Sequence, residues 1–172
     1  MKEINFAALT LQDALDFAIL IEKEAAERYG ELADQMSTHH TDEAAGFFRF
    51  MVVNETKHGD ELTARRKALF GDAPSTIDES LISEVEAPEY ETVRVFMTVE
   101  DALEVALQAE KKAYAFFVNA IKSVKNADVI KLFEELRQEE IEHQELVQNE
   151  MKKLPPRENV DIDDYADEPV AQ

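Results

Sequence analysis

Residues 10–29 read TLQDALDFAILIEKEAAERY, and residues 98–117 read TVEDALEVALQAEKKAYAFF. The two stretches align without a gap, and their apolar side chains recur every three or four residues, as on one face of an α-helix. Each stretch begins with a threonine followed three residues later by an aspartate, a pattern that caps the start of a helix. The repeat therefore predicts two helices of similar sequence, one in each half of the chain.

A second helical stretch follows each copy of the repeat, so the chain is predicted to form two helical hairpins. A linker joins them, and an extended residue spans about 3.3 Å, so this linker can run back along a helix of about 42 Å. We therefore expect an all-α fold, a four-helix bundle with one long crossover between helices two and three. The helices are expected at about residues 11–36, 42–70, 99–124 and 128–154, with the linker at 71–97.

One domain is expected to occupy residues 1–154, followed by an acidic and mobile tail at residues 155–172. The chain of 172 residues has 38 acidic and 18 basic side chains, a formal net charge of −20. This charge opposes binding to nucleic acid and to anionic membranes. No apolar run approaches the length of about 20 residues that a membrane span needs, and no secretory signal is recognised. The cytoplasm is the expected location.

The apolar stripe of each predicted helix is interrupted near its middle by chemically reactive side chains. Helices one and three each carry a glutamate there, and helices two and four each carry a Glu-x-x-His pair. The spacing within that pair places both side chains on one helix face. The interrupting residues are Glu22, Glu55, His58, Glu110, Glu140 and His143.

Four carboxylates in one dry core repel one another, and each costs several kcal/mol when it is unpaired. No lysine or arginine lies on a stripe within one helical turn of the six residues. Two divalent ions would balance the four carboxylates, with two neutral imidazoles completing the coordination. Such ligands suit iron or manganese. We expect two iron ions as the cofactor, and manganese or zinc could occupy the same site. The alternative is a bundle that kept the residues but lost the metal.

The residues lie in segments that resemble the rubrerythrin branch of the ferritin-like superfamily. The segments are IEKEAAERY, ETKH, AEKKAYAFF and EEIEH, and the resemblance covers about residues 11–154. It implies that Glu55 and Glu140 bridge the metals, that Glu22 and Glu110 are terminal ligands, and that each histidine binds one ion. The same six residues would act in catalysis through the metals.

This chain differs from full rubrerythrins in two features. Those proteins carry a four-cysteine rubredoxin module that supplies electrons, whereas this chain has no cysteine. Their third helix also carries a second carboxylate, three residues after the first, which exchanges with histidine; here that position is Ala113. An electron donor would therefore be a separate protein, and the site is similar to simpler ferritin-like oxidases and ferroxidases.

We therefore expect a di-iron oxidoreductase that oxidises Fe(II), or a small substrate, with O₂ or peroxide. Two alternatives stay open: a peroxide reductase with an external electron donor, and a non-enzymatic iron-binding or storage cargo protein. Tyr29 and Tyr114 lie within two helical turns of Glu22 and Glu110 respectively. Either tyrosine could donate a hydrogen bond to a ligand carboxylate, and a role in core packing explains them equally well.

Several aromatic residues lie off the predicted core stripes. Unpaired aromatic side chains at helix edges indicate a partner surface, and ferritin-like proteins resembling this one commonly dimerise through helix flanks. We therefore expect a homo-oligomer, at least a homodimer. The residues concerned are Phe47, Phe50, Phe96 and Phe116.

Overall fold

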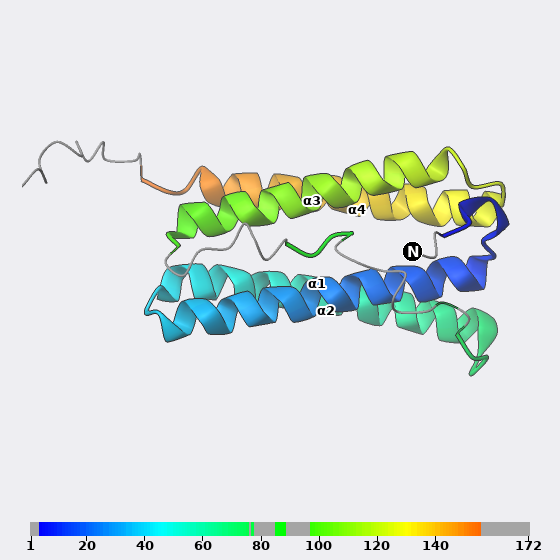
Figure 1. Ribbon diagram of the computed structural model, residues 1–172, viewed down its shortest axis with the longest axis horizontal. Helices are drawn as coiled ribbons and strands as arrows, with labels where there is room; N and C mark the ends of the chain where they lie inside the picture. Colours follow the sequence, from blue (N-terminus) through cyan, green and yellow to red (C-terminus); the bar gives the residue numbers. More distant parts are fainter. Residues whose placement is uncertain (1–3, 76, 78–84, 89–96, 156–172) are drawn as a thin grey trace, which may run out of the picture.

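The four predicted helices pack side by side along most of their length (Figure 1). The computed structural model describes residues 4–75, 77, 85–88 and 97–155. Helices α1 and α2 form one layer of the bundle, and α3 and α4 form the other. The predicted four-helix fold with one long crossover is confirmed, and each helix ends within three residues of its expected limit. The elements are η1 (Phe6–Ala8), α1 (Leu11–Thr38), α2 (Asp42–Phe70), α3 (Val99–Ile121) and α4 (Ala127–Met151).

Some of the predictions concern segments that the structure does not describe. Apart from Pro155, the predicted C-terminal tail lies outside the described residues, and so does much of the 71–97 linker. None of the described helices combines the length and the apolar character needed to cross a bilayer.

Helices α1 and α3 begin with the same capping arrangement. The backbone N–H of Asp13 donates to the Thr10 hydroxyl at 3.2 Å, and the Thr10 N–H donates to the Asp13 carboxylate at 3.1 Å. Thr98 and Asp101 repeat this exchange at 3.1 and 3.0 Å. Each capping box satisfies two backbone donors that the helix cannot satisfy itself. The two capped helices therefore carry their central glutamates at the same distance from their first turns.

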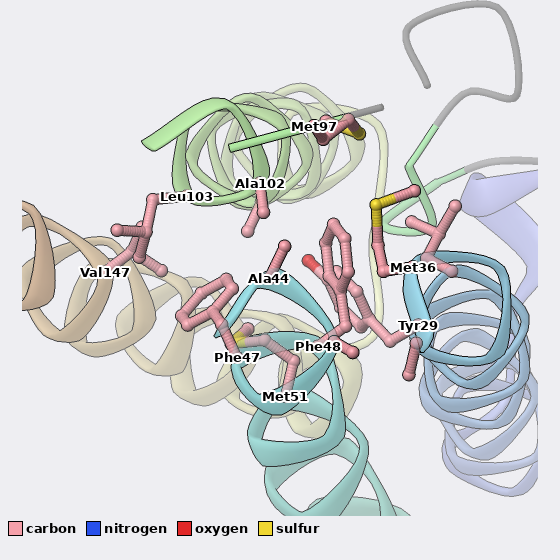
Figure 2. Packing of buried hydrophobic residues seen from close by; sticks show 14 of the residues in the cluster. Tyr29, Met36, Ala44, Phe47, Phe48, Met51, Met97, Ala102, Leu103 and Val147 are labelled. Atoms are coloured by element: carbon pink, nitrogen blue, oxygen red, sulfur yellow. The ribbon is translucent and has the colours of Figure 1, made fainter. Parts of the chain in front are cut away.

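The apolar core is divided into two clusters, one toward each end of the bundle. One cluster contains Phe17, Phe117 and Phe133. The other contains Phe48 and Met51, which pack against residues of α1 and α3 in Figure 2. Between the clusters, the core positions of all four helices are occupied by the predicted glutamates and histidines. The fold thus places a polar layer between two apolar ones.

Two of the off-stripe aromatic residues are packed, so the expectation that they are unpaired is wrong. The ring of Phe116 lies 5.8 Å from that of Phe6 and 5.7 Å from that of Phe17. Phe47 is 9% exposed and lies 6.0 Å from the ring of Phe48. Helical periodicity did not reveal the packing of Phe116, because its partner Phe6 comes from η1, outside the bundle helices.

Phe50 is the other off-stripe aromatic residue that the structure describes, and its exposure does not test the oligomeric state. The homodimer therefore stays a prediction. Phe50 is 42% exposed and lies near Val53, which is 66% exposed, on the same helix. Phe96 lies outside the described residues.

Candidate metal centre

The six predicted ligands lie together in the polar layer and come from all four helices. The four glutamates are 4% exposed or less, and His143 is 6% exposed. His58 is less buried, with 17% of its side chain exposed. Glu22 comes from α1, Glu55 and His58 from α2, Glu110 from α3, and Glu140 and His143 from α4.

Possible ligand atoms approach within 4.8 Å of one another in three overlapping groups. One group consists of Glu55, His58 and His143, which come from α2 and α4. Metal–ligand bonds of about 2.0–2.2 Å place the ligands of one ion within about 4.4 Å of each other, so each group is close to the size that one ion holds. The second group is Glu22, His58 and Glu139, and the third is Glu55, Glu86, Glu110 and His143.

Glu140 is the one predicted ligand that lies outside these groups. It is 3% exposed, and the charges of Glu110 and Glu22 act on it. It belongs to none of the three groups found among the described residues. The structure therefore places five of the predicted ligands in compact groups and leaves Glu140 beside them.

The two histidine rings stack on each other, with centroids 4.8 Å apart and an interplanar angle of 28°. Nδ1 of His143 lies 3.2 Å from Oε2 of Glu110. Its other ring nitrogen, Nε2, has no partner among the described residues. A hydrogen bond from Nδ1–H to the carboxylate would fix the tautomer and leave Nε2 free to bind a metal.

Tyr29 lies where a hydrogen-bond donor to a ligand was predicted. Its hydroxyl donates to Oε1 of Glu110 at 3.0 Å, and its side chain is completely buried. Burial, followed by the charge of Glu110, raises the pKa of Tyr29 well above its ordinary value, so the hydroxyl keeps its proton. Tyr114 is half-buried and makes no hydrogen bond to these carboxylates within the described ranges.

Many polar atoms in this layer are buried without a hydrogen-bond partner among the described residues. Both oxygens of Glu55 are in this state. An unpartnered buried carboxylate costs several kcal/mol, and a bound cation removes that cost. The donor set of carboxylates and imidazoles therefore fits a pair of metal ions. The other such atoms in the layer are Oε2 of Glu22, both oxygens of Glu86, Nδ1 of His58, Oε2 of Glu140 and Nε2 of His143.

Two acidic residues of these groups were not predicted as ligands. Glu139 was expected on the surface, but its carboxylate lies 3.9 Å from Nδ1 of His58, with 40% of its side chain exposed. Glu86 comes from the crossover and is 1% exposed. The crossover has no helical periodicity that could reveal its inward side. The one available signal is that small or apolar residues, Val85 and Ala87, flank this glutamate.

The sequence model of the rubrerythrin family matches residues 13–151. The chain belongs to the rubrerythrin family. An uncharacterised conserved protein from Magnetospirillum magnetotacticum MS-1 shares 32% identity and a TM-score of 0.65, over 87% of this chain and 99% of that one. A Rhodobacter capsulatus bacterioferritin, whose structure has a metal-free dinuclear site and a heme iron, shares 19% identity over 81% of this chain and 83% of its own. Its TM-score of 0.54 shows a shared fold. No curated protein matches significantly.

The carboxylates of this rubrerythrin-family site destabilise one another's charged forms. Burial, with the charges of neighbouring glutamates, raises the pKa of Glu22, Glu55 and Glu140 well above the ordinary value. Burial and the charge of Glu110 raise the pKa of Glu86 to about 7. Without metal, the folded chain therefore holds protons that the unfolded chain releases.

Folding shifts the pKa values of the two histidines in opposite directions. Burial, with the charges of His143 and Lys57, lowers the pKa of His58. Burial also acts to lower the pKa of His143, but the hydrogen bond and the charge of Glu110 outweigh it and raise that pKa. Two residues in matching positions of the repeat thus have different surroundings.

The metal-free rubrerythrin-family chain is expected to lose stability between about pH 5 and about pH 7.5. A carboxyl whose pKa is raised by folding stabilises the fold while it is protonated, and this stability is lost as the pH rises through the folded pKa. For Glu86 alone the loss is about 3 kcal/mol, which lowers the Tm by about 6 °C or more. The lowered pKa of His58 acts in the opposite direction, but it is one group against the raised pKa values of five carboxyls and of His143.

Thermal unfolding of the chelated protein at several pH values measures this effect. Glu86→Gln should flatten the pH dependence, whereas Asp72→Asn, an exposed carboxylate in the same crossover, should not. A Tm that is constant or rises over this interval contradicts the prediction.

A groove between α1 and α2 leads from the surface to this centre. Its volume is about 250 Å³, and Glu22 and Glu55 line it together with the exposed Glu27 and Asp60. Gly59 also lines the groove, and a Cβ atom at that position would lie 3.4 Å from the Cβ of Glu22. Lys23 also lines the groove and lies 3.8 Å from the Glu27 carboxylate, so a lining of mixed charge adjoins two of the predicted ligands.

Proposed function

We propose that this chain is a di-iron carboxylate protein that oxidises Fe(II), or a small substrate, with O₂ or peroxide. The observation that carries the proposal is the layer of buried carboxylates from all four helices, in which α1, α2, α4 and the crossover contribute oxygens without a hydrogen-bond partner among the described residues. Four glutamate charges offset those of two divalent ions, and the two imidazoles complete a donor set suited to iron. The proposed ligands are Glu22, Glu55, His58, Glu110, Glu140 and His143.

The chain's own residues would hold the ions and set their surroundings. As the family resemblance implies, Glu55 and Glu140 would each hold both ions, and Glu22 and Glu110 would each hold one. A bound iron pair would supply the electrons that reduce O₂ or peroxide. Tyr29 would orient Glu110 through the hydrogen bond to Oε1, which keeps Oε2 directed at His143. The apolar clusters on either side would keep bulk water from the ligands.

Fe(II) as a substrate would reach the centre through the groove between α1 and α2. A net charge of −20 attracts cations to the protein surface. Among the lining residues, Asp60 would extend that attraction toward the carboxylates of Glu22 and Glu55, while Lys23 pairs with Glu27 and offsets its charge.

A peroxide reductase with an external electron donor is a second candidate. The position of Ala113 argues against it, because α3 offers no second carboxylate there. Glu86 supports it, because it brings a further buried carboxylate next to Glu110 and His143. A donor protein would have to supply the electrons, since the chain has no cysteine to hold an iron–sulfur centre.

Anaerobic Fe(II) titration is expected to saturate at two ions per chain. The reason is the charge of the buried carboxylates, which a single divalent ion leaves largely uncompensated. Isothermal calorimetry measures the stoichiometry, with Glu104→Gln as a control because Glu104 is exposed on α3. Saturation at one ion or at none contradicts the paired site.

Stopped-flow mixing of the loaded protein with O₂ or with H₂O₂ then separates the candidate functions. Faster reaction with O₂ favours the Fe(II) oxidase, and much faster reaction with H₂O₂ favours the peroxide reductase. If neither oxidant reacts faster than it does with free Fe(II), the non-enzymatic iron-binding protein is the better description.

A further inference from the structure

We propose that Glu86 is a seventh ligand of the metal centre, carried by the crossover and not by a helix, and that Arg28 and Lys112 hold it in position. The inference rests on the function proposed above, since it adds a ligand to the same site.

The Glu86 carboxylate lies inside the bundle, facing residues of both hairpins. One of its oxygens lies within 4.8 Å of possible ligand atoms of Glu55, Glu110 and His143. Both oxygens are buried without a hydrogen-bond partner among the described residues. A buried carboxylate in this state costs several kcal/mol. A shared cation would offset that cost and would explain why the side chain points inward.

Two cationic side chains fix the segment that carries Glu86 by binding its backbone. Arg28 of α1 donates to the carbonyl oxygen of Pro88 at 2.7 Å. Lys112 of α3 donates to the carbonyl oxygen of Ala87 at 3.0 Å. In Figure 1 the segment 85–88 runs along the middle of the bundle, and its two anchors belong to different hairpins. The anchors therefore hold the segment at the depth of the polar layer.

The neighbouring helix cannot supply this carboxylate. Ala113, three residues after Glu110 on α3, is fully buried and has no ligand atom. Within the described parts of the chain, Glu55 already lies beside Glu110 and His143, and the crossover adds Glu86 as a third carboxylate. Glu86 is therefore placed where an additional ligand would complete the coordination of the ion nearest His143.

Co(II) binding to the full chain tests the assignment, because the visible absorption of Co(II) reports its ligands independently of turnover. Glu86→Gln keeps the size of the side chain and removes its charge. We expect the affinity for at least one of two Co(II) ions to fall by roughly tenfold or more, since loss of even an indirect partner of a metal site has that effect. The absorption spectrum should also change. Asp72→Asn, in the same crossover, should alter neither.

Lys112→Met tests the positioning role separately. It should weaken Co(II) binding in the wild-type background and have little further effect in Glu86→Gln, because both changes act on one ligand. Hydrogen exchange of residues 85–88 in the metal-loaded protein should become faster in Lys112→Met. Fully additive losses of affinity contradict the positioning role.

The outcomes separate this inference from the proposed function. If the wild type binds two ions and Glu86→Gln does so with unchanged affinity and spectrum, Glu86 is not a ligand and the proposed function stands. If the wild type binds no Co(II), both proposals fail. If Glu86→Gln does not fold, Glu86→Asp, which keeps the charge on a shorter side chain, takes its place. An unchanged Co(II) spectrum in that variant also contradicts the assignment.

Discussion

Mn(II) is expected to raise the Tm of the chelated protein by about 8–16 °C when the free ion is at about 1,000 times its Kd. A ligand that binds only the folded chain adds about 4 kcal/mol under that condition, and about 1 kcal/mol shifts the Tm of a chain of this size by about 2–4 °C. Mn(II) suits the carboxylate and imidazole donors and is not oxidised during the scan. Differential scanning calorimetry with and without chelator measures the effect.

Mg(II) is the control for this experiment, because it also screens the charge of −20 but binds few nitrogen ligands. It should raise the Tm much less than Mn(II) does. If chelation leaves the Tm unchanged, the buried carboxylates are satisfied by protons or water and the metal centre is not formed.

Glu55→Met is expected to make the metal-free protein more stable and to remove most of the stabilisation by Mn(II). Glu55 is fully buried and neither of its oxygens has a hydrogen-bond partner among the described residues. Methionine has a similar length, favours helices and carries no charge. Burying a polar group that has no hydrogen-bond partner costs about 1–3 kcal/mol, and methionine removes that cost. This corresponds to a Tm at least about 2–4 °C higher without metal.

The matched control is Glu104→Met, at an exposed position in the first half of α3. It should change the stability by no more than about 0.5 kcal/mol and leave the response to Mn(II) intact. A lower Tm for metal-free Glu55→Met would show that Glu55 stabilises the fold itself. Unchanged stabilisation by Mn(II) would remove Glu55 from the ligand set.

Much of this fold could be predicted because its determinants are local and periodic. The caps at Thr10 and Thr98 are complete within four residues, and each capping box forms as its sequence indicates. The central glutamates and the Glu-x-x-His pairs stand out because they interrupt an otherwise apolar stripe. Helical periodicity alone places them on the inner face, so their burial follows from the pattern.

What could not be predicted depends on chain segments without periodicity. Glu86 is one of several acidic residues in the crossover, and it faces inward where Arg28 and Lys112 bind the backbone of the two residues that follow it. The packing of Phe116 against Phe6 likewise depends on η1, which precedes the first bundle helix. In both cases a residue distant in sequence decides which way the side chain faces.

The repeat gives the molecule an approximate twofold symmetry, and Glu86 breaks it. Exchanging the hairpins would superimpose His58 on His143, yet folding moves their pKa values in opposite directions. Glu86 is fully buried beside Glu110 and His143, whereas the additional acidic residue beside His58 is Glu139, which has 40% of its side chain exposed. Two ions bound by otherwise matching ligands would therefore feel different electrostatic potentials. The two positions would then differ in their affinity for the same divalent ion.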